Sequence, residues 1–185
     1  HDGQNLFDEY APYGNWGIDK SLEKLAKLGI GDVIIVAIDH GGVLRIQEYL
    51  PYSTPRYTEA EGNLYIKFML EDLMPKIASK FRVMPGRSNT GIGGSSLGGL
   101  ISLYAGFKYP QIFGNMMIFS PSLWISEEIY EMAYKYIPAG PTDIFLYAGG
   151  MESANHYSQV LRLEKILEEK RKYSGFELIF SHNPS

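Results

Sequence analysis

The hydrophobic residues of this chain follow two kinds of spacing, and the first kind predicts helices. Between residues 18 and 28, apolar side chains recur every three or four positions and Gly29 follows, which is typical of a surface helix that ends at a glycine. The same spacing predicts a helix that opens at Gly62 or Asn63 and runs to residue 81, with a kink or a fresh turn at Pro75. Further helices are expected over residues 97–108, near 127–136 and over about 154–171.

The second kind of spacing is a short apolar run, and it predicts strands. Residues 32–38 are continuously apolar after Asp32 and rich in valine and isoleucine, which is typical of a strand that helices bury on both faces. Further strands are expected just before Ser96 and over residues 115–120, 143–148 and 176–180. Because helices and strands alternate without an internal repeat, the sequence predicts an α/β fold with a mostly parallel sheet flanked by helices on both faces.

The remaining segments of the chain indicate how the domain is organised. Residues 39–55 are expected to form a long loop at the carboxyl end of the strand before them. The 185 residues are enough for one core, so we expect a single domain over residues 1–185. The chain opens at His1 without an initiator methionine and stops in a loop after its last strand. We therefore expect N- and C-terminal parts of the domain to lie outside it.

The candidate chemistry lies in residues 90–100, which read TGIGGSSLGGL. Residues 94–98 form a G-x-S-x-G pattern between a predicted strand and a predicted helix that starts at Leu97. A serine hydroxyl is a weak nucleophile unless it is held exposed, beside a base and near donors for the oxyanion it creates. A sharp turn holds it exposed, and the helix start supplies a backbone N–H and the positive end of a dipole. Ser96 is therefore the candidate nucleophile.

Other interpretations of this stretch are weaker. In the plainest one, Ser95 or Ser96 only caps the helix inside a glycine-rich turn. The strand before the pattern and the amphipathic helix after it favour a nucleophile elbow instead. A nucleotide triphosphate loop would need a Gly-Lys-Ser/Thr sequence, and a dinucleotide fingerprint counted from Gly91 would need glycine at position 96.

A serine nucleophile needs a histidine base and an acid that orients the base, each just past the carboxyl end of a strand. Glu152 meets this condition for the acid, because it follows the glycine turn that closes the strand over 143–148. The alternative is a solvated glutamate at the start of a helix. Of the four histidines, His182 alone follows the last predicted strand, where the order serine, acid, histidine places the base.

Composition excludes several classes of protein. The net charge is −4 and neither end carries a basic run, so the chain has no electrostatic footprint for nucleic acid or an anionic membrane. The absence of cysteine excludes disulfides and thiolate metal sites and leaves the compartment open. The longest apolar run, residues 33–38, is far shorter than the roughly 18 residues that a membrane-spanning helix needs.

Several segments together resemble a known family. They are HDGQNLFD at the start, WGIDKSLEKL followed by VIIVAID, the segment EYLP, the block GGSSLGGLISLYAGFKYPQIFGNMMIFSPSLW, and the turn YAGGMES. They are similar to the putative esterase family of α/β-hydrolases, which includes enterochelin-esterase-like enzymes, feruloyl and acetylxylan esterases, and mycolyltransferases. The resemblance implies an α/β-hydrolase fold and a triad of serine, acid and histidine, with Ser96 as nucleophile and Glu152 as acid.

The resemblance also implies an oxyanion hole and the place of the base. Backbone N–H groups of Gln4 and Leu97 would hold the oxyanion. The histidine of the family lies in a loop a few residues after the last strand, and no matching loop occurs before Ser185. We therefore expect the base beyond residue 185, with His182 as the weaker candidate within the chain.

These observations predict a serine-dependent carboxylic-ester hydrolase that works through an acyl-enzyme. The substrate would be a small-molecule or carbohydrate-linked ester, and no metal or organic cofactor is required. Trp124, in the segment SPSLW, is expected either to form a wall beside the acyl group or to be buried in the core. An acyltransferase of the same fold and a non-catalytic member that binds a glycan or a protein are the alternatives. The sequence does not choose among ester substrates or oligomeric states.

Overall fold

The computed structural model of the protein describes residues 1–7, 10–11, 14–31, 33–150, 152–153 and 155–183. The chain forms two units, residues 1–45 and residues 46–185. The expected single domain over residues 1–185 stays a prediction, and the two units are described in turn below.

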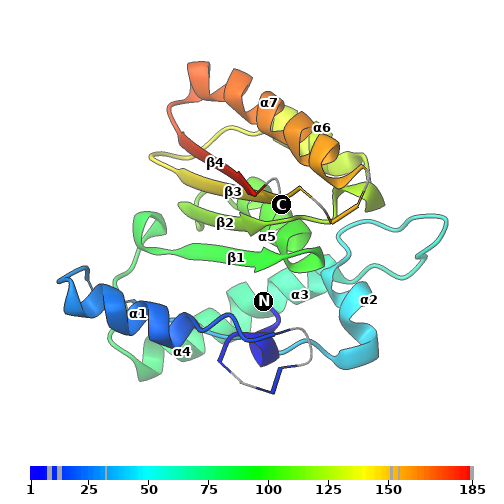
Figure 1. Ribbon diagram of the computed structural model, residues 1–185. Coiled ribbons are helices and arrows are strands. Elements are labelled where there is room, and N and C mark those ends of the chain that lie inside the picture. The colour runs from blue at the N-terminus through cyan, green and yellow to red at the C-terminus, as the bar shows by residue number, and fades with distance from the viewer. Residues whose placement is uncertain (8–9, 12–13, 32, 151, 154, 184–185) are drawn as a thin grey trace. The chain divides into compact units, whose positions relative to one another are not determined.

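A four-stranded parallel sheet is the centre of the second unit (Figure 1). Its strands follow one another in chain order across the sheet, as β1 (Gly91–Ser95), β2 (Asn115–Phe119), β3 (Asp143–Gly149) and β4 (Glu177–Asn183). All neighbouring pairs are parallel, which confirms the predicted sheet. Because the strands are parallel, all four carboxyl ends meet at one edge. The strand β4 continues to Asn183, so the loop expected after residue 180 is wrong for residues 181–183.

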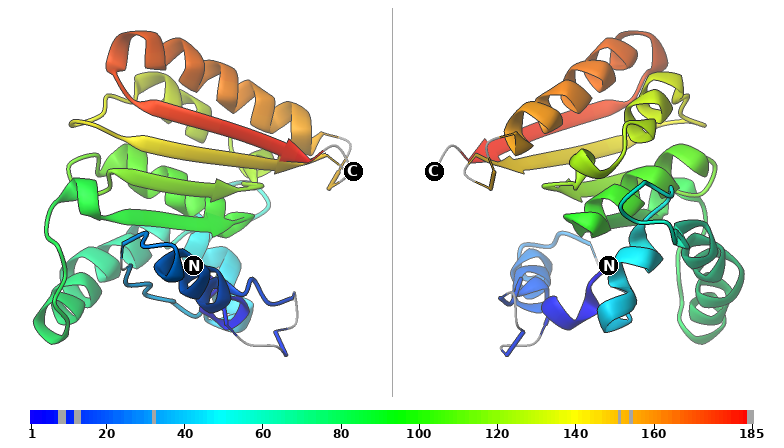
Figure 2. Two further views of the ribbon diagram at one scale, coloured as in Figure 1. Left: turned by 60° about the vertical axis from the view of Figure 1, so that its left-hand side comes forward. Right: turned by 90° about the vertical axis from the view of Figure 1, so that its right-hand side faces the viewer.

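Three helices of this unit connect the strands: α5 (Leu97–Lys108), α6 (Glu128–Lys135) and α7 (His156–Ser174). The register places Met116 and Leu178 on either side of Ile144, so these buried residues share one face of the sheet. Gly106 of α5 lies directly against the Met116 side chain, and Tyr157 of α7 contacts the even-numbered face of β4. Both helices therefore cover the same face (Figure 2).

The core lies between that face and the helices. Its members are fully buried or nearly so: Ile118, Ile144 and Leu146 from the strands, Leu100, Ile101 and Leu103 from α5, Ile129 from α6, and Val160, Leu163 and Leu167 from α7. The helix boundaries follow the predicted spacing, and α5 has the bounds that the sequence predicted. None of the helices in the described parts of the chain is both long enough and apolar enough to cross a membrane.

The helix expected from Gly62 to residue 81 is present and interrupted where predicted. It consists of α3 (Gly62–Phe68), a π-helical turn (Met69–Leu73) and α4 (Met74–Lys80). Pro75 lies in the first turn of α4, where its missing N–H costs nothing. A proline ring collides with the carbonyl four residues earlier in a regular α-helix, so the wider turn just before it relieves that collision.

The first unit contains the helix α1 (Ile18–Lys27) and two 3₁₀ turns, Gly3–Asn5 and Gly42–Leu44. The helix α1 confirms the helix predicted over 18–28, and Gly29 adopts φ 73° just past its end. The loop expected over residues 39–55 is partly helical, because it also contains α2 (Arg45–Tyr49), which begins at the junction between the units.

The strand predicted over residues 32–38 is not formed in the described residues 33–38, so that prediction is wrong for them. Asp32, where it was to begin, lies outside the described residues. Val33 and Ile34 are 59% and 50% exposed. A strand needs a neighbour that pairs with its backbone, and the apolar pattern reports the tendency to be buried but not the presence of that neighbour.

Candidate active site

Ser96 occupies the sharp turn between β1 and α5. Its φ of 56° and ψ of −120° lie outside the conformations that non-glycine residues ordinarily adopt. Its N–H donates to the Phe119 carbonyl (3.0 Å) and its own carbonyl accepts from the Ser122 N–H (3.0 Å), so the end of β2 and the loop after it hold this conformation. The residue is exposed while Leu97 beside it is buried. The turn therefore presents a serine side chain at the carboxyl edge of the sheet, as a nucleophile elbow does.

Gly94 makes this turn possible. A Cβ atom at position 94 would lie 2.8 Å from the backbone carbonyl group of Gly98. Real Cβ atoms do not approach backbone so closely, so the end of β1 and the first turn of α5 can pack together only with glycine at position 94. The first glycine of the G-x-S-x-G pattern is thus explained by this close approach.

The Ser96 hydroxyl forms a hydrogen bond with the hydroxyl of Ser122. The two Oγ atoms are 2.9 Å apart, and either can be the donor. Ser122 is buried in the loop that follows β2. A polar partner at this distance can hold the Ser96 side chain in one rotamer before a substrate arrives.

Glu152 lies past the end of β3, at the same edge of the sheet. Its Oε1 accepts a hydrogen bond from the Ser120 hydroxyl, and its Oε2 lies 3.3 Å from Nε2 of His156. A Cβ atom at Gly149 would fall 2.3 Å from Oε1, so the carboxylate folds back over a position that only glycine leaves open. The Glu152 side chain remains 43% exposed. The carboxylate can therefore accept a further hydrogen bond from a third group.

Ser120 is the residue directly after β2. Ser95 and Phe119 are register partners, so Ser96 and Ser120 are the next residues of neighbouring strands. The Ser120 N–H donates to the Tyr147 carbonyl (2.8 Å), which continues the ladder toward β3. Ser96 and Ser120 therefore both lie at the carboxyl edge of the sheet, directly after neighbouring strands.

The two serines of the loop after β2 were not predicted as site residues. Both belong to the segment SPSLW, whose likeness to a family was evident in the sequence. Ser120 and Ser122 are buried, and each hydroxyl contacts a candidate catalytic side chain. Once β2 is known to lie beside β1, the position of Ser120 directly after β2 is the signal that indicates it.

Neither histidine of the second unit contacts Ser96 in the described structure. His156 is buried, and its Nε2 lies near Glu152 without the alignment of a hydrogen bond. His182 lies in β4, where its ring stacks on Phe180 (6.0 Å between centroids) and contacts Tyr157 (5.5 Å). The His182 ring is therefore directed to the helix face of the sheet.

Trp124 is 53% exposed between the buried residues Leu123 and Ile125. The alternative in which it is buried in the core is therefore wrong. Its expected role as a wall beside the acyl group stays a prediction. The exposed ring belongs to the short 3₁₀ turn Leu123–Ile125, two residues after Ser122, which contacts Ser96.

Gln4 lies in the first unit, in the turn that follows the buried residue Asp2. Its side chain is fixed on the backbone of His40, because Nε2 donates to the His40 carbonyl (2.9 Å) and Oε1 accepts from the His40 N–H (3.2 Å). Asp2 accepts two hydrogen bonds from Arg45, at 2.7 and 2.8 Å. Leu97 belongs to the second unit, as the first residue of α5, where its N–H has no acceptor within the helix. The joint oxyanion role of Gln4 and Leu97 stays a prediction.

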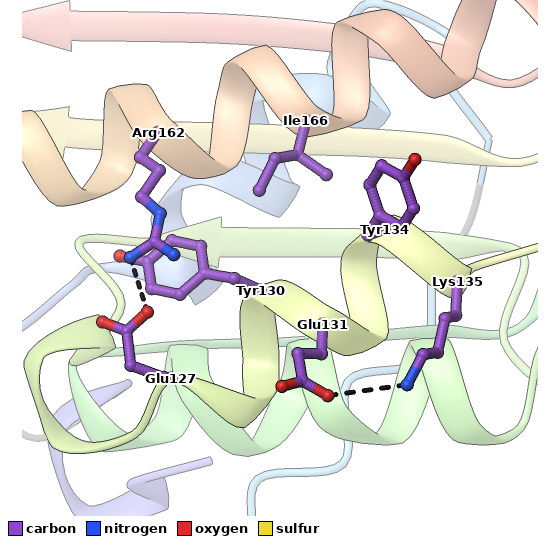
Figure 3. Close-up of a pocket in the computed structure, with 7 residues that line it drawn as sticks. All are labelled: Glu127, Tyr130, Glu131, Tyr134, Lys135, Arg162 and Ile166. Carbon is purple, nitrogen blue, oxygen red and sulfur yellow. Dashed lines mark hydrogen bonds and ion pairs between the residues drawn. The ribbon is translucent and has the colours of Figure 1, made fainter.

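A shallow groove of about 330 Å³ lies between α6 and α7 (Figure 3). The Arg162 guanidinium stacks on the Tyr130 ring (3.9 Å to the centroid) and pairs with Glu127 (2.6 Å). The charges in this groove are therefore matched by neighbours, and none of the candidate site residues lines it.

The parallel sheet, the covering helices and the elbow at the carboxyl edge together define an α/β-hydrolase fold. Residues 1–162 match the model of the Esterase family, described as "Putative esterase". Because the match covers most of the chain, the protein belongs to this family.

The chain is also similar to individual proteins over part of their length. The chain is 28% identical over 141 residues to the uncharacterized protein YbbA of Bacillus subtilis (strain 168), which covers 71% of this chain and 56% of that protein. An IroE-like serine hydrolase from Shewanella oneidensis has a similar structure, with a TM-score of 0.79 at 21% identity over 100% of this chain and 62% of that one. The enterobactin esterase FES from Shigella flexneri gives a TM-score of 0.74 at 20% identity over 98% of this chain and 45% of that one. The chain thus spans about half the length of these relatives, and the two structures show the fold.

Proposed function

We propose that the protein is a serine-dependent carboxylic-ester hydrolase that works through an acyl-enzyme. The observation that carries the proposal is the exposed Ser96 at a strained strand–helix turn, together with the Glu152 carboxylate, which Ser120 holds at the same edge of the sheet. Membership of the esterase family supports the same class of reaction. The backbone conformation of Ser96 costs about 1–3 kcal/mol, and backbone strain of this kind is concentrated at functional sites.

In the first half of the proposed reaction, the Ser96 oxygen attacks the ester carbonyl. A histidine takes the Ser96 proton, and Glu152 orients that histidine and stabilises the imidazolium. Negative charge develops on the carbonyl oxygen, where the N–H groups of Leu97 and Gln4 would stabilise it. One such donor is commonly worth about 10²- to 10³-fold in kcat. The imidazolium then protonates the leaving alcohol, and the acyl group stays on Ser96.

In the second half, water replaces the alcohol. The same histidine takes a proton from water, which attacks the acyl-enzyme, and the same amides hold the second oxyanion. Collapse of this intermediate breaks the bond between the acyl carbon and the Ser96 oxygen, and the imidazolium returns the proton to Ser96. Proton transfer and oxyanion stabilisation supply the reduction of the barrier, so the proposed steps call for no metal or organic cofactor.

The base is proposed to be a histidine that follows β4 in the protein at its full natural length. His182 is the weaker candidate because its ring packs against Phe180 and Tyr157 on the helix face. A base must reach both Ser96 and the open side of the Glu152 carboxylate.

A serine-directed fluorophosphonate probe and p-nitrophenyl acetate test the proposal on the protein at its full natural length. We expect wild type to be labelled and to hydrolyse the ester, and Ser96→Ala to lose both activities. Ser79→Ala is the matched control, because its exposed hydroxyl donates to the Lys76 carbonyl within α4. A wild type that neither reacts nor hydrolyses any ester would favour a non-catalytic member of the family. Further esters should be tested beside p-nitrophenyl acetate. Enterobactin should be one of them, because a similar structure is that of an enterobactin esterase.

A further inference from the structure

The Ser120 hydroxyl lies between two groups of the candidate site and bonds to both. It donates to Oε1 of Glu152 and accepts from the Gly149 N–H at 3.3 Å. Ser120 is buried, so few other partners compete for its hydroxyl. A hydroxyl that donates to a carboxylate and accepts from the backbone is fixed in direction, and it fixes the carboxylate in turn.

The backbone of Ser120 indicates that its side chain is needed. Ser120 adopts φ 42°, in the left-handed region that favours glycine. Glycine would adopt this conformation without steric cost, whereas serine loses about 1 kcal/mol or more there. A strained serine that makes two hydrogen bonds with its side chain is best explained by those hydrogen bonds.

The contacts of Glu152 leave one side of its carboxylate open. Ser120 occupies Oε1, and His156 Nε2 lies 3.3 Å from Oε2 on the helix side. A carboxylate offers about four lone-pair positions, so the base can still donate its N–H to Glu152. The two contacts together limit the rotation of the carboxylate about its last side-chain bond.

We propose that Ser120 is a positioning residue, which holds the Glu152 carboxylate in the orientation that the base requires. This inference rests on the proposed hydrolase function. Ser120 does not touch the reacting atoms and acts through Glu152. Ser122 of the same loop contacts the Ser96 hydroxyl, so this loop contacts both the proposed nucleophile and the proposed acid.

Three variants of the protein at its full natural length test the inference with p-nitrophenyl acetate. We expect Ser120→Ala to lower kcat about 10- to 100-fold, since a small misplacement of a catalytic group has effects of this size. We expect KM to change less than about twofold, because substrate binding is not altered. Ser120→Gly removes the same hydroxyl but relieves the backbone, and we expect it to lose as much kcat as Ser120→Ala. Ser126→Ala is the matched control, because Ser126 is also buried and donates to a carboxylate, that of Glu128. It should keep the wild-type kcat.

Coupling to Glu152 completes the test. In a Glu152→Ala background, Ser120→Ala should lower kcat by less than about twofold, since Ser120 has then lost the group it positions. A wild-type kcat in Ser120→Gly would overturn the inference. So would a double variant whose loss in kcat is the product of the losses in the two single variants. Either result would leave the proposed hydrolase function standing. Full esterase activity in Ser96→Ala would instead overturn the proposed function on which the inference rests.

Discussion

At the scale of single residues, backbone strain coincides with polar contacts. The non-glycine residues with positive φ in the described structure are Asp2 (56°), Ser96 (56°) and Ser120 (42°). Ser96 and Ser120 contact Ser122 and Glu152 through their hydroxyls, and Asp2 is held by Arg45. Strain of this kind persists where the surroundings determine the conformation, and here those surroundings are the candidate site and the turn that contains Gln4.

Gly149→Ala should damage activity far more than stability. The new Cβ would lie 2.3 Å from Oε1 of Glu152, so the carboxylate must leave its place. We expect kcat to fall about 10- to 100-fold, as for other displacements of a catalytic group. Esterase assays and thermal melting measure the two effects. Gly31→Ala is the control, because a Cβ there meets nothing within 4 Å. An unchanged kcat in Gly149→Ala would argue against a role for the observed Glu152 position.

The sequence predicted part of the candidate site at this scale. Ser96 and Glu152 could be predicted because each lies at a fixed distance from a glycine turn after an apolar run. Ser120 and Ser122 could not be predicted in the same way. Their roles depend on which strand lies beside β1 and on the register between them, and periodicity within one segment reports neither.

At the scale of elements, local signals predicted the helices better than the strands. The glycine turn before Leu97 and the apolar spacing after it determine α5 without help from distant residues. The run over residues 33–38 carries an equally clear apolar pattern and forms no strand, because strand pairing is a contact with another segment. The same reason explains why the expected end of β4 was too early, since the pairing of Gly149 with Asn183 extends it.

The contact between α5 and β2 predicts a pair of compensating substitutions. A Cβ at Gly106 would lie 2.1 Å from the Met116 sulfur, so Gly106→Ala should overpack the core. Overpacking costs about 1–3 kcal/mol, and alanine regains up to about 1 kcal/mol of helix propensity. We expect Gly106→Ala to lower the free energy of unfolding by about 1–2 kcal/mol in urea titrations. In a Met116→Ala background the same change should cost nothing or stabilise the protein, and equal costs in both backgrounds would contradict the packing.

The packing of α6 on α7 predicts a loss of stability at high pH. Burial raises the pKa of Tyr130 to about 12. The charge of Arg162 lowers this pKa by a smaller amount, and the charge of Glu127 raises it slightly. The unfolded chain releases this proton near pH 10, so the contribution of Tyr130 is complete below pH 10 and is lost as the pH rises toward 12. Urea midpoints of wild type should therefore fall more steeply over this range than those of Tyr130→Phe. Parallel curves for the two proteins would contradict the raised pKa.

At the scale of the whole molecule, the sheet of the second unit is the feature that brings the candidate residues together. Ser96 follows β1, Ser120 follows β2 and Glu152 follows β3, so three neighbouring parallel strands bring these residues to one edge. This is the general position of sites in open α/β sheets, and it is why the alternation of elements in the sequence predicted where a site would be.

Hydrogen exchange on the 185-residue chain tests this arrangement. The amides of β2 and β3 pair with strands on both sides, so we expect them to be the slowest to exchange. The amides of residues 33–38, whose described part forms no strand, should exchange faster by orders of magnitude. Equal protection of residues 33–38 and of β2 would show that the apolar run is paired after all.

The most direct test of the account is to find where a serine-directed probe attaches. The protein at its full natural length should be treated with a fluorophosphonate, digested, and analysed by tandem mass spectrometry. We predict one stoichiometric adduct on Ser96 and its loss in Ser96→Ala, with labelling slowed but not abolished in Ser120→Gly. An adduct on another serine, or undiminished labelling of Ser96→Ala, would contradict the assignment of Ser96 as the nucleophile.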